Sequence, residues 1–247
     1  MKKLNVVLVG LGFGGAFVPI YKDHPAVEHW DFDTDTGRME EFARTHGIQR
    51  QYHSFDEILR DKEVDAVHLV TPIPLHAEQT VAVLDSGKHC ACTVPMATSL
   101  EDLERITAAV RRSGKKYMMM ETTLYTRQFF YARQMLENGE FGKIQFLRGS
   151  HYQDMANWPS YWMGLPPMWY GTHAIAPMRV MAGTRIQKVH CFGSGTMEEW
   201  LTRQYQNPYP VETAIFAFEN GLKGEATRTL FETARVYQEG MFIYGSE

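Results

Sequence analysis

The sequence predicts an α/β fold in which a doubly wound parallel sheet is followed by an α+β domain with a mainly antiparallel, open sheet. Two observations carry this prediction. Up to about residue 124, short β-branched runs alternate with amphipathic helical stretches, a pattern typical of parallel strands covered by helices on both faces. Beyond that point long alternating runs dominate, as in antiparallel strands with one covered face.

The first predicted domain covers residues 1–124. We expect strands over 4–10, 27–33, 66–72, 88–94 and 115–121, and helices that begin at about Gly14 and then cover 37–47, 74–87 and 99–114. The last of these helices has sharp ends, because Ser99 is placed as its N-cap and Gly114 follows its last turn as a C-cap.

The second predicted domain covers residues 125–247. We expect one helix over 127–142, another that begins at His173, and strands over 143–155, 187–195, 211–221, 222–231 and 236–246. Asn220 and Gly221 lie between two of these strands and form a strong hairpin signal. The chain stops directly after a strand pattern, so we expect that a partner covers this edge or that the fold continues in C-terminal sequence missing here.

Composition excludes several classes of function. A net charge of −4 without any basic block repels a phosphate backbone, so we expect no nucleic-acid partner. The sequence has no apolar span long enough for a membrane, and its N-terminus does not read as a secretory signal, so we expect a cytoplasmic protein. The three cysteines (Cys90, Cys92 and Cys191) support neither a disulfide framework nor a metal site.

A glycine-rich loop follows the first predicted strand. Gly10, Gly12 and Gly15 form a G-x-G-x-x-G frame, with Phe13 and Gly14 inside it. The first glycine of such a frame permits the tight turn, the second lets the backbone approach a pyrophosphate, and the third lets the helix pack closely on the strand. The loop therefore predicts a dinucleotide site.

Asp33 closes the second predicted strand, where a carboxylate accepts hydrogen bonds from the ribose hydroxyls of NAD and repels a 2′-phosphate. We therefore expect NAD rather than NADP. The alternative is that Asp33 only caps the helix that follows.

Thr71 and Pro72 end the predicted strand over 66–72, and His76 comes soon after it, so all three lie at the carboxyl edge, where ligands bind in doubly wound sheets. We expect this segment to contact the dinucleotide. The alternative for His76 is a histidine at a helix start with no ligand.

The glycine loop, Asp33, residues 70–97 and residues 171–183 together resemble the Gfo/Idh/MocA family of NAD(P)-dependent sugar and cyclitol oxidoreductases. The resemblance implies a Rossmann domain followed by a domain whose sheet forms the substrate site and often the oligomer interface. It also implies a chain longer than 247 residues.

The chain departs from the family pattern at the motif that usually reads Glu-Lys-Pro. Here Thr93, Val94 and Pro95 stand in its place, so the lysine that usually contacts the substrate hydroxyl and the nicotinamide ribose is absent. We still expect Thr93 and Pro95 to contact the cofactor. Trp169 and Ala176 stand where the family often has aspartates.

His173 keeps the place of the family histidine. Oxidation of a carbinol needs a base near the working pH, and histidine suits this role best. We therefore expect His173 to be catalytic, with help from Glu121 at the carboxyl edge and from Tyr152. The alternative is a buried structural histidine.

A mixture of aromatic and polar residues surrounds the predicted strand that ends near residue 155. Aromatic faces stack on sugar rings while carboxylates and imidazoles bind hydroxyls, so we expect His151, Asp154, Trp162 and Tyr170 to contact substrate. Alternatively, part of this set only fills a core.

The resemblance implies an oxidoreductase that transfers a hydride between nicotinamide and a secondary hydroxyl of a carbohydrate or cyclitol, with the chain as a homo-oligomer, a dimer or tetramer built through the second-domain sheet. Two alternatives stay open. One is a redox-neutral, NAD-dependent glycosidase or lyase that acts through a transient keto-sugar, and the other is a non-catalytic dinucleotide-binding protein.

Overall fold

The computed structural model describes residues 3–233 and 237–247. The chain divides into two compact units, Met1–Met120 and Glu121–Glu247. The division falls slightly before the expected boundary at residue 124, because the 3-10 helix η3 (Thr122–Tyr125) packs against helices of the second unit.

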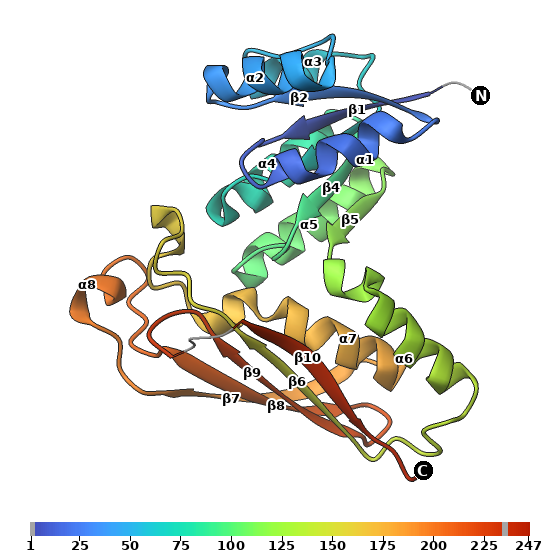
Figure 1. Cartoon of the computed structure of the whole chain (residues 1–247), viewed down its shortest axis with the longest axis vertical. Helices are drawn as coiled ribbons and strands as arrows, with labels where there is room; N and C mark the ends of the chain where they lie inside the picture. The colour runs from blue at the N-terminus through green and yellow to red at the C-terminus, as the bar shows by residue number, and fades with distance from the viewer. Residues whose placement is uncertain (1–2, 234–236) are drawn as a thin grey trace. The chain divides into compact units, whose positions relative to one another are not determined.

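The first unit is a five-stranded sheet in the order β2-β1-β3-β4-β5, and every pair of neighbours is parallel (Figure 1). Its strands are β1 (Leu4–Val9), β2 (Val27–Phe32), β3 (Ala66–Leu69), β4 (His89–Thr93) and β5 (Tyr117–Met120). Its helices are η1 (Gly14–Phe17), α1 (Val18–Asp23), α2 (Thr36–His46), α3 (Phe55–Arg60), η2 (Ile73–Leu75), α4 (His76–Asp85) and α5 (Leu100–Ser113). This is the predicted doubly wound sheet.

Two apolar clusters show that both faces of this sheet are covered. Val7 and Val9 belong to a cluster with residues of α3, α4 and α5, whereas Leu8 belongs to a second cluster with Val18 and Met39. Alternate residues of a strand point to opposite faces, so the run 6–9 is apolar on both sides.

Helix ends follow the capping signals. The hydroxyl of Ser99 accepts from the amide of Asp102 at 3.1 Å, and Gly114 adopts φ +65° after α5, as predicted. Helix α3 was not predicted, although its signal is present: Ser54 accepts from the amide of Glu57, and the Glu57 carboxylate accepts from the amide of His53.

The second unit is a mixed five-stranded sheet in the order β10-β6-β9-β8-β7, in which only the β6–β9 pair is parallel (Figure 1). Its strands are β6 (Phe146–Tyr152), β7 (Ile186–Ser194), β8 (Val211–Phe218), β9 (Lys223–Thr229) and β10 (Gln238–Tyr244). Besides η3, its helices are α6 (Arg127–Glu137), η4 (Ser160–Trp162), η5 (Pro167–Tyr170), α7 (Thr172–Ala182) and α8 (Glu199–Thr202).

Helices α6 and α7 pack on one face of this sheet through Phe129, Leu147, Met178 and Phe216. Gly221 adopts φ +88° in the tight turn between β8 and β9, which confirms the predicted hairpin.

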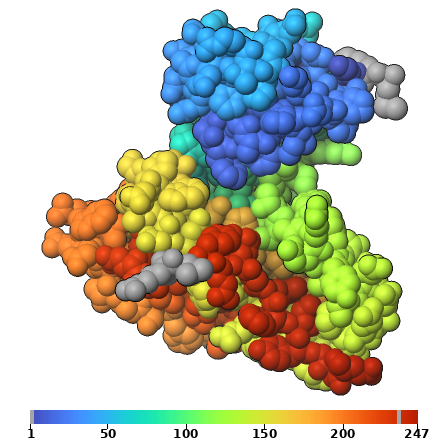
Figure 2. Space-filling model, viewed as in Figure 1, coloured from blue at the N-terminus to red at the C-terminus, as the bar shows by residue number. Residues whose placement is uncertain are grey.

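The opposite face of the same sheet carries exposed apolar side chains, among them Ile215, Phe242 and Tyr244. Strand β10, at the red end of the colour scale, lies at the edge of this sheet and stays visible on the surface of the second unit (Figure 2). Among the residues described, no helix is long and apolar enough to span a bilayer.

Candidate active site

The glycine loop has the shape that a dinucleotide requires. Gly10 adopts φ +93°, and a Cβ there would lie 2.4 Å from the carbonyl oxygen of Val70. A Cβ on Gly15 would lie 2.4 Å from Cζ of Phe42. A Cβ on Gly12 would meet only the Arg38 guanidinium, at 3.9 Å, so the backbone of Gly12 is open to a ligand. The loop residues therefore fit NAD.

The other two loop residues, Gly14 and Phe13, differ in burial. The backbone of Gly14 lies against Val70, so that a Cβ there would come within 3.2 Å of the valine Cβ. The side chain of Phe13 is 66% exposed and points away from the core. Phe13 is thus accessible to a ligand from solvent.

Asp33 follows β2 and is buried. Its carboxylate accepts from the amides of Leu11, at 2.6 Å, and Asp35, at 2.8 Å. Arg38 donates to the same group at 3.3 Å, a neighbour that sequence reasoning missed. The cap of α2 is Asp35, which accepts from the Arg38 amide at 3.0 Å, so Asp33 has the different role of tying the end of β2 to the glycine loop.

Gly10, Thr71 and Thr93 lie at one edge, because they follow or end the parallel strands β1, β3 and β4. Thr71 donates its hydroxyl to Gln79 at 2.6 Å, and the Thr93 hydroxyl donates to the Leu69 carbonyl at 3.4 Å. Pro72 continues this edge as the residue before η2.

His76 is buried beneath this edge. Its Nδ1 lies 2.8 Å from the carbonyl oxygen of Pro95 and its Nε2 lies 2.8 Å from that of Thr71. Burial lowers the pKa of His76, although the two carbonyl contacts act against it. The ring holds two loops together and has no nitrogen left for a ligand, so the structure favours the alternative of a histidine without direct cofactor contact.

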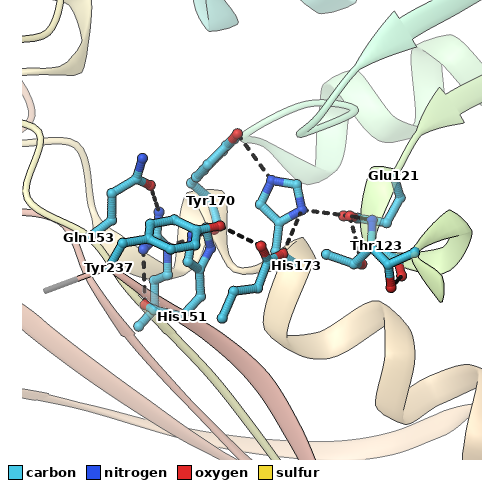
Figure 3. Close-up of polar contacts among 10 residues, drawn as sticks. Glu121, Thr123, His151, Gln153, Tyr170, His173 and Tyr237 are labelled. Atoms are coloured by element: carbon cyan, nitrogen blue, oxygen red, sulfur yellow. Dashed lines mark hydrogen bonds and ion pairs between the residues drawn. The ribbon is translucent and has the colours of Figure 1, made fainter. Parts of the chain in front are cut away.

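The second unit contains an acid–base pair in which Glu121 is buried and His173 is partly buried (Figure 3). His173 lies in the first turn of α7, and its Nδ1 is 2.5 Å from Oε1 of Glu121. The same oxygen accepts from the amide of Thr123 at 3.1 Å and from its hydroxyl at 2.8 Å. Burial by itself raises the pKa of Glu121, but the hydrogen bond and charge of His173 outweigh it and hold that pKa below its usual range.

An ionised Glu121 can only accept a hydrogen bond, so it assigns the proton of a neutral His173 ring to Nδ1. The lone pair of Nε2 then faces the hydroxyl of Tyr170 at 3.1 Å (Figure 3). Burial raises the pKa of Tyr170 to about 12, so its hydroxyl stays a donor. The three side chains form a relay with the base at Nε2.

A buried arginine, Arg228, holds the backbone next to the relay in place. Arg228 is fully buried, and its guanidinium donates to the carbonyl oxygens of Tyr170 at 3.0 Å, His151 at 2.9 Å and Thr229 at 2.7 Å, and to the side chain of Gln153 at 2.9 Å. Burial lowers the pKa of Arg228 to about 10. This residue, which sequence reasoning missed, fixes the backbone of Tyr170.

His151 lies edge-on to His173, with ring centroids 5.1 Å apart. Gly149 permits this approach of α7 to β6, since a Cβ on it would lie 2.1 Å from the carbonyl oxygen of Ala174. His151 is buried and neither ring nitrogen has a hydrogen-bond partner among the described residues. Burial, with the charges of Arg228 and His173, lowers the pKa of His151 to about 2.

The structure does not bring all the expected residues to this relay. Tyr152 follows His151 in β6, and neighbours in a strand point to opposite faces, so the Tyr152 side chain lies on the face of the sheet away from the relay. Asp154 is exposed and accepts from the amide of Ala156, away from the relay. Trp162 is buried with its ring 4.8 Å from that of Tyr170, so it packs behind the relay rather than offering a face to sugar.

Glu239 and Tyr237 complete the surroundings of His173. A carboxylate oxygen of Glu239 lies 3.8 Å from Nδ1 of His173, and the Tyr237 hydroxyl donates to Glu239. Glu239 pairs with His151 across the two strands. No local signal could have found this contact, because it depends on the pairing of strands far apart in the sequence. The described residues include no cluster of histidine, cysteine and carboxylate side chains suited to a metal ion.

A parallel sheet with a glycine loop at its carboxyl edge defines an N-terminal dinucleotide-binding domain of the Rossmann class. Residues 4–121 match the "Oxidoreductase family, NAD-binding Rossmann fold", and residues 129–247 match the "GFO/IDH/MocA C-terminal domain". The chain therefore belongs to the Gfo/Idh/MocA family, and NAD is its cofactor.

The chain is similar to proteins of several activities. It is 24% identical over 203 residues to a 1-carboxy-3-chloro-3,4-dihydroxycyclohexa-1,5-diene dehydrogenase of Comamonas testosteroni, an alignment that covers 79% of this chain and 49% of that protein. It is 29% identical over 112 residues to a glycosyl hydrolase family 109 protein of Stenotrophomonas maltophilia, covering 45% of this chain and 25% of the relative. The chain thus spans at most about half the length of these curated relatives.

A solved structure of levoglucosan dehydrogenase, in complex with NADH and levoglucosan, superposes on this chain with a TM-score of 0.83. The two are 25% identical, and the match covers 100% of this chain and 72% of the other. Both units therefore have counterparts in a protein solved with NADH and levoglucosan.

Proposed function

We propose that this protein is an NAD-dependent oxidoreductase that transfers a hydride between nicotinamide and a secondary hydroxyl of a carbohydrate or cyclitol. The observation that carries the proposal is the buried relay in which His173 lies between the Glu121 carboxylate and the Tyr170 hydroxyl. The names of the Comamonas dehydrogenase and of levoglucosan dehydrogenase support the reaction class. The first unit holds NAD in this proposal, and the second holds the substrate.

The residues of the second unit handle the proton. The Tyr170 hydroxyl donates to Nε2 of His173 and can accept from a substrate hydroxyl, so the substrate proton moves to Tyr170 as the tyrosine proton moves to Nε2. Glu121 then stabilises the imidazolium through its bond with Nδ1. When bound, NAD supplies the hydride acceptor.

The relay also accounts for the absence of the family lysine. Val94 stands at its place and is buried, so this position can neither donate to a substrate hydroxyl nor hold a charge. The Glu121–His173 pair supplies an acid and a base without a contribution from residue 94.

NADH absorbance at 340 nm tests the proposal, with purified protein, NAD and a panel of sugars, anhydrosugars and cyclitols. We expect one compound to raise the NADH signal, and His173→Asn to lower its turnover by about 10²-fold or more. His53→Asn is the matched control, because His53 is exposed on the first unit and belongs neither to the relay nor to the proposed interface. Wild-type turnover in His173→Asn would remove the relay from the reaction.

The likeness to the family 109 glycosyl hydrolase supports a second candidate, a redox-neutral glycosidase or lyase. Here the same relay removes a proton next to a transient keto group. The same assay separates the candidates, because this reaction releases an aglycone from a glycoside without net NADH. NAD binding without either signal would indicate a non-catalytic dinucleotide-binding protein.

We also propose a homo-oligomer, a dimer or tetramer, through the helix-free face of the second-unit sheet. The exposed apolar side chains Ile215, Phe242 and Tyr244 support it, since such patches mark interfaces. Light scattering tests the assembly, and Ile215→Lys should yield monomer.

A further inference from the structure

A cavity of about 370 Å³ lies within the second unit and reaches His173. It is bounded by η3, α6, α7 and β10. Its volume is in the range of pockets that enclose small organic ligands. Of the residues expected at the site, the catalytic candidate His173 lines it, whereas the residues expected to bind substrate do not.

The two ends of the cavity differ in polarity. Beside His173 the wall is polar and includes Thr123, Tyr237 and Glu239. The rest of the wall is mainly apolar and combines side chains of α6, α7 and β10: Phe129, Ala132, Pro177, Met241 and Ile243, with the exposed Thr126 and Gln128 at the start of α6. A ligand that occupies the whole cavity therefore presents hydroxyls at one end and carbon at the other.

The charge near the cavity is negative. Glu239 lines it, and both Glu239 and Glu121 lie near Nδ1 of His173. The described lining includes no lysine or arginine. Arg228, the nearby cation, already donates to oxygens of His151, Thr229, Tyr170 and Gln153. A carboxylate or phosphate on the ligand would thus meet repulsion without a compensating partner.

We propose that this cavity receives the part of the substrate away from the reacting hydroxyl, and that it selects a neutral ring with a vicinal diol on one edge and C–H groups on the opposite edge. The inference rests on the proposed function and deepens it. A ring hydroxylated at every carbon would bury hydroxyls against Phe129, Met241 and Ile243 without partners.

Three related compounds test the selection: trans-1,2-cyclohexanediol, myo-inositol and 3,4-dihydroxycyclohexane-1-carboxylate. We expect kcat/KM for NADH formation to be about tenfold or more higher for cyclohexanediol than for either other compound. Saturation-transfer NMR measures binding of the same compounds to the NAD-loaded protein independently of turnover. We expect the same order.

Two variants change the cavity in opposite directions. Ala132→Phe fills it and should weaken cyclohexanediol binding about tenfold or more, whereas Met241→Ala widens it and should favour a bulkier diol such as 4-tert-butyl-1,2-cyclohexanediol. Ala156→Phe is the matched control, because Ala156 is exposed outside the cavity. Circular dichroism verifies folding, and Met241→Ala still tests the cavity if Ala132→Phe does not fold.

The outcomes separate the inference from the proposed function. A preference for myo-inositol overturns the inference. So does unchanged cyclohexanediol binding in folded Ala132→Phe, if Met241→Ala also shows no gain for the bulkier diol. Oxidation can still occur in both cases. Binding of cyclohexanediol that is lost in Ala132→Phe supports the cavity even where none of the three compounds yields NADH. The proposed function alone is overturned if no compound of the wider panel of sugars, anhydrosugars and cyclitols yields NADH.

Discussion

The tautomer of His173 is a direct consequence of the buried pair and can be measured without a substrate. Glu121 is 2% exposed and its Oε1 lies 2.5 Å from Nδ1 of His173. We predict that the neutral ring carries its proton on Nδ1 and that Glu121→Gln removes this preference. The glutamine keeps the shape of the side chain and removes only its charge.

The structure sets the size of the effect. A hydrogen bond to a charged group contributes about 1.5–3 kcal/mol, and a neutral one, such as Nε2–H to Tyr170, about 0.5–1.5 kcal/mol. The difference of ~1–2 kcal/mol favours the Nδ1–H form roughly 5- to 30-fold. In Glu121→Gln both bonds are neutral, so the two tautomers approach equal populations. The imidazolium that forms during turnover also loses its carboxylate, a loss of ~3 kcal/mol that lowers kcat by about 10²-fold.

Two-bond ¹⁵N–¹H correlation spectra distinguish the two ring nitrogens and are recorded at pH 9, above the ordinary histidine pKa of about 6.5. His173→Asn assigns the signals by their disappearance. Thr123→Val is the matched control, because it removes the 2.8 Å bond to the same carboxylate oxygen and leaves His173 in contact. A predominantly Nε2–H ring in the wild type, or an Nδ1–H preference unchanged in Glu121→Gln, would refute the relay.

Three further predictions concern the first unit. Gly10→Ala should lower the free energy of unfolding of this unit by ~2 kcal/mol or more, measured by urea denaturation. The residue has φ +93°, and a Cβ there would lie 2.4 Å from a carbonyl oxygen. The control Gly87→Ala, at φ +82° with no neighbour within 4 Å, should lower the free energy of unfolding by less. Asp33→Asn keeps an acceptor for the Leu11 amide and should weaken NAD binding about tenfold in calorimetry, and unchanged affinity would remove Asp33 from the site. His68 is buried, and burial together with His29 lowers its pKa to about 4, so the unfolded chain binds more protons than the folded one between about pH 6.5 and 4. Stability should therefore fall by about 1.4 kcal/mol per pH unit on acidification through that window, and His68→Asn should flatten this slope; an unaltered slope would show that His68 is not its source.

The fold was predictable because its signals are local or periodic. The alternation of strands and helices in the first unit and the Asn220–Gly221 turn each specify their structure within a few residues. Helix α3 was missed although the Ser54–Glu57 cap marks its start. The six residues of α3 give too short a periodic pattern to stand out, so only the cap could have revealed it.

The site was predictable only in part. His173 and Glu121, which the structure brings into contact, were expected at the site, the first by resemblance and the second by its place at the end of a parallel strand. Tyr152 and His151 were both expected at the site, because the exact register of β6 against α7 is not encoded locally and a shift of one residue exchanges the two faces. Glu239 reaches His173 only through the pairing of β10 with β6, which joins residues far apart in the sequence.

Because Glu121 is buried, the roles of Glu121 and His173 depend on each other. A carboxylate that is 2% exposed is costly without a partner, and the ring of His173 is the cationic partner it can acquire once the proton arrives. Removal of His173 therefore leaves the Glu121 carboxylate as a buried charge without its partner. Removal of Glu121 leaves a His173 ring in which neither nitrogen is preferred for the proton. The two single substitutions should each lower turnover by about 10²-fold, and the double variant should lose little more, since both changes disable one unit. Multiplicative losses in Glu121→Gln/His173→Asn would instead mean that the two side chains act on separate steps.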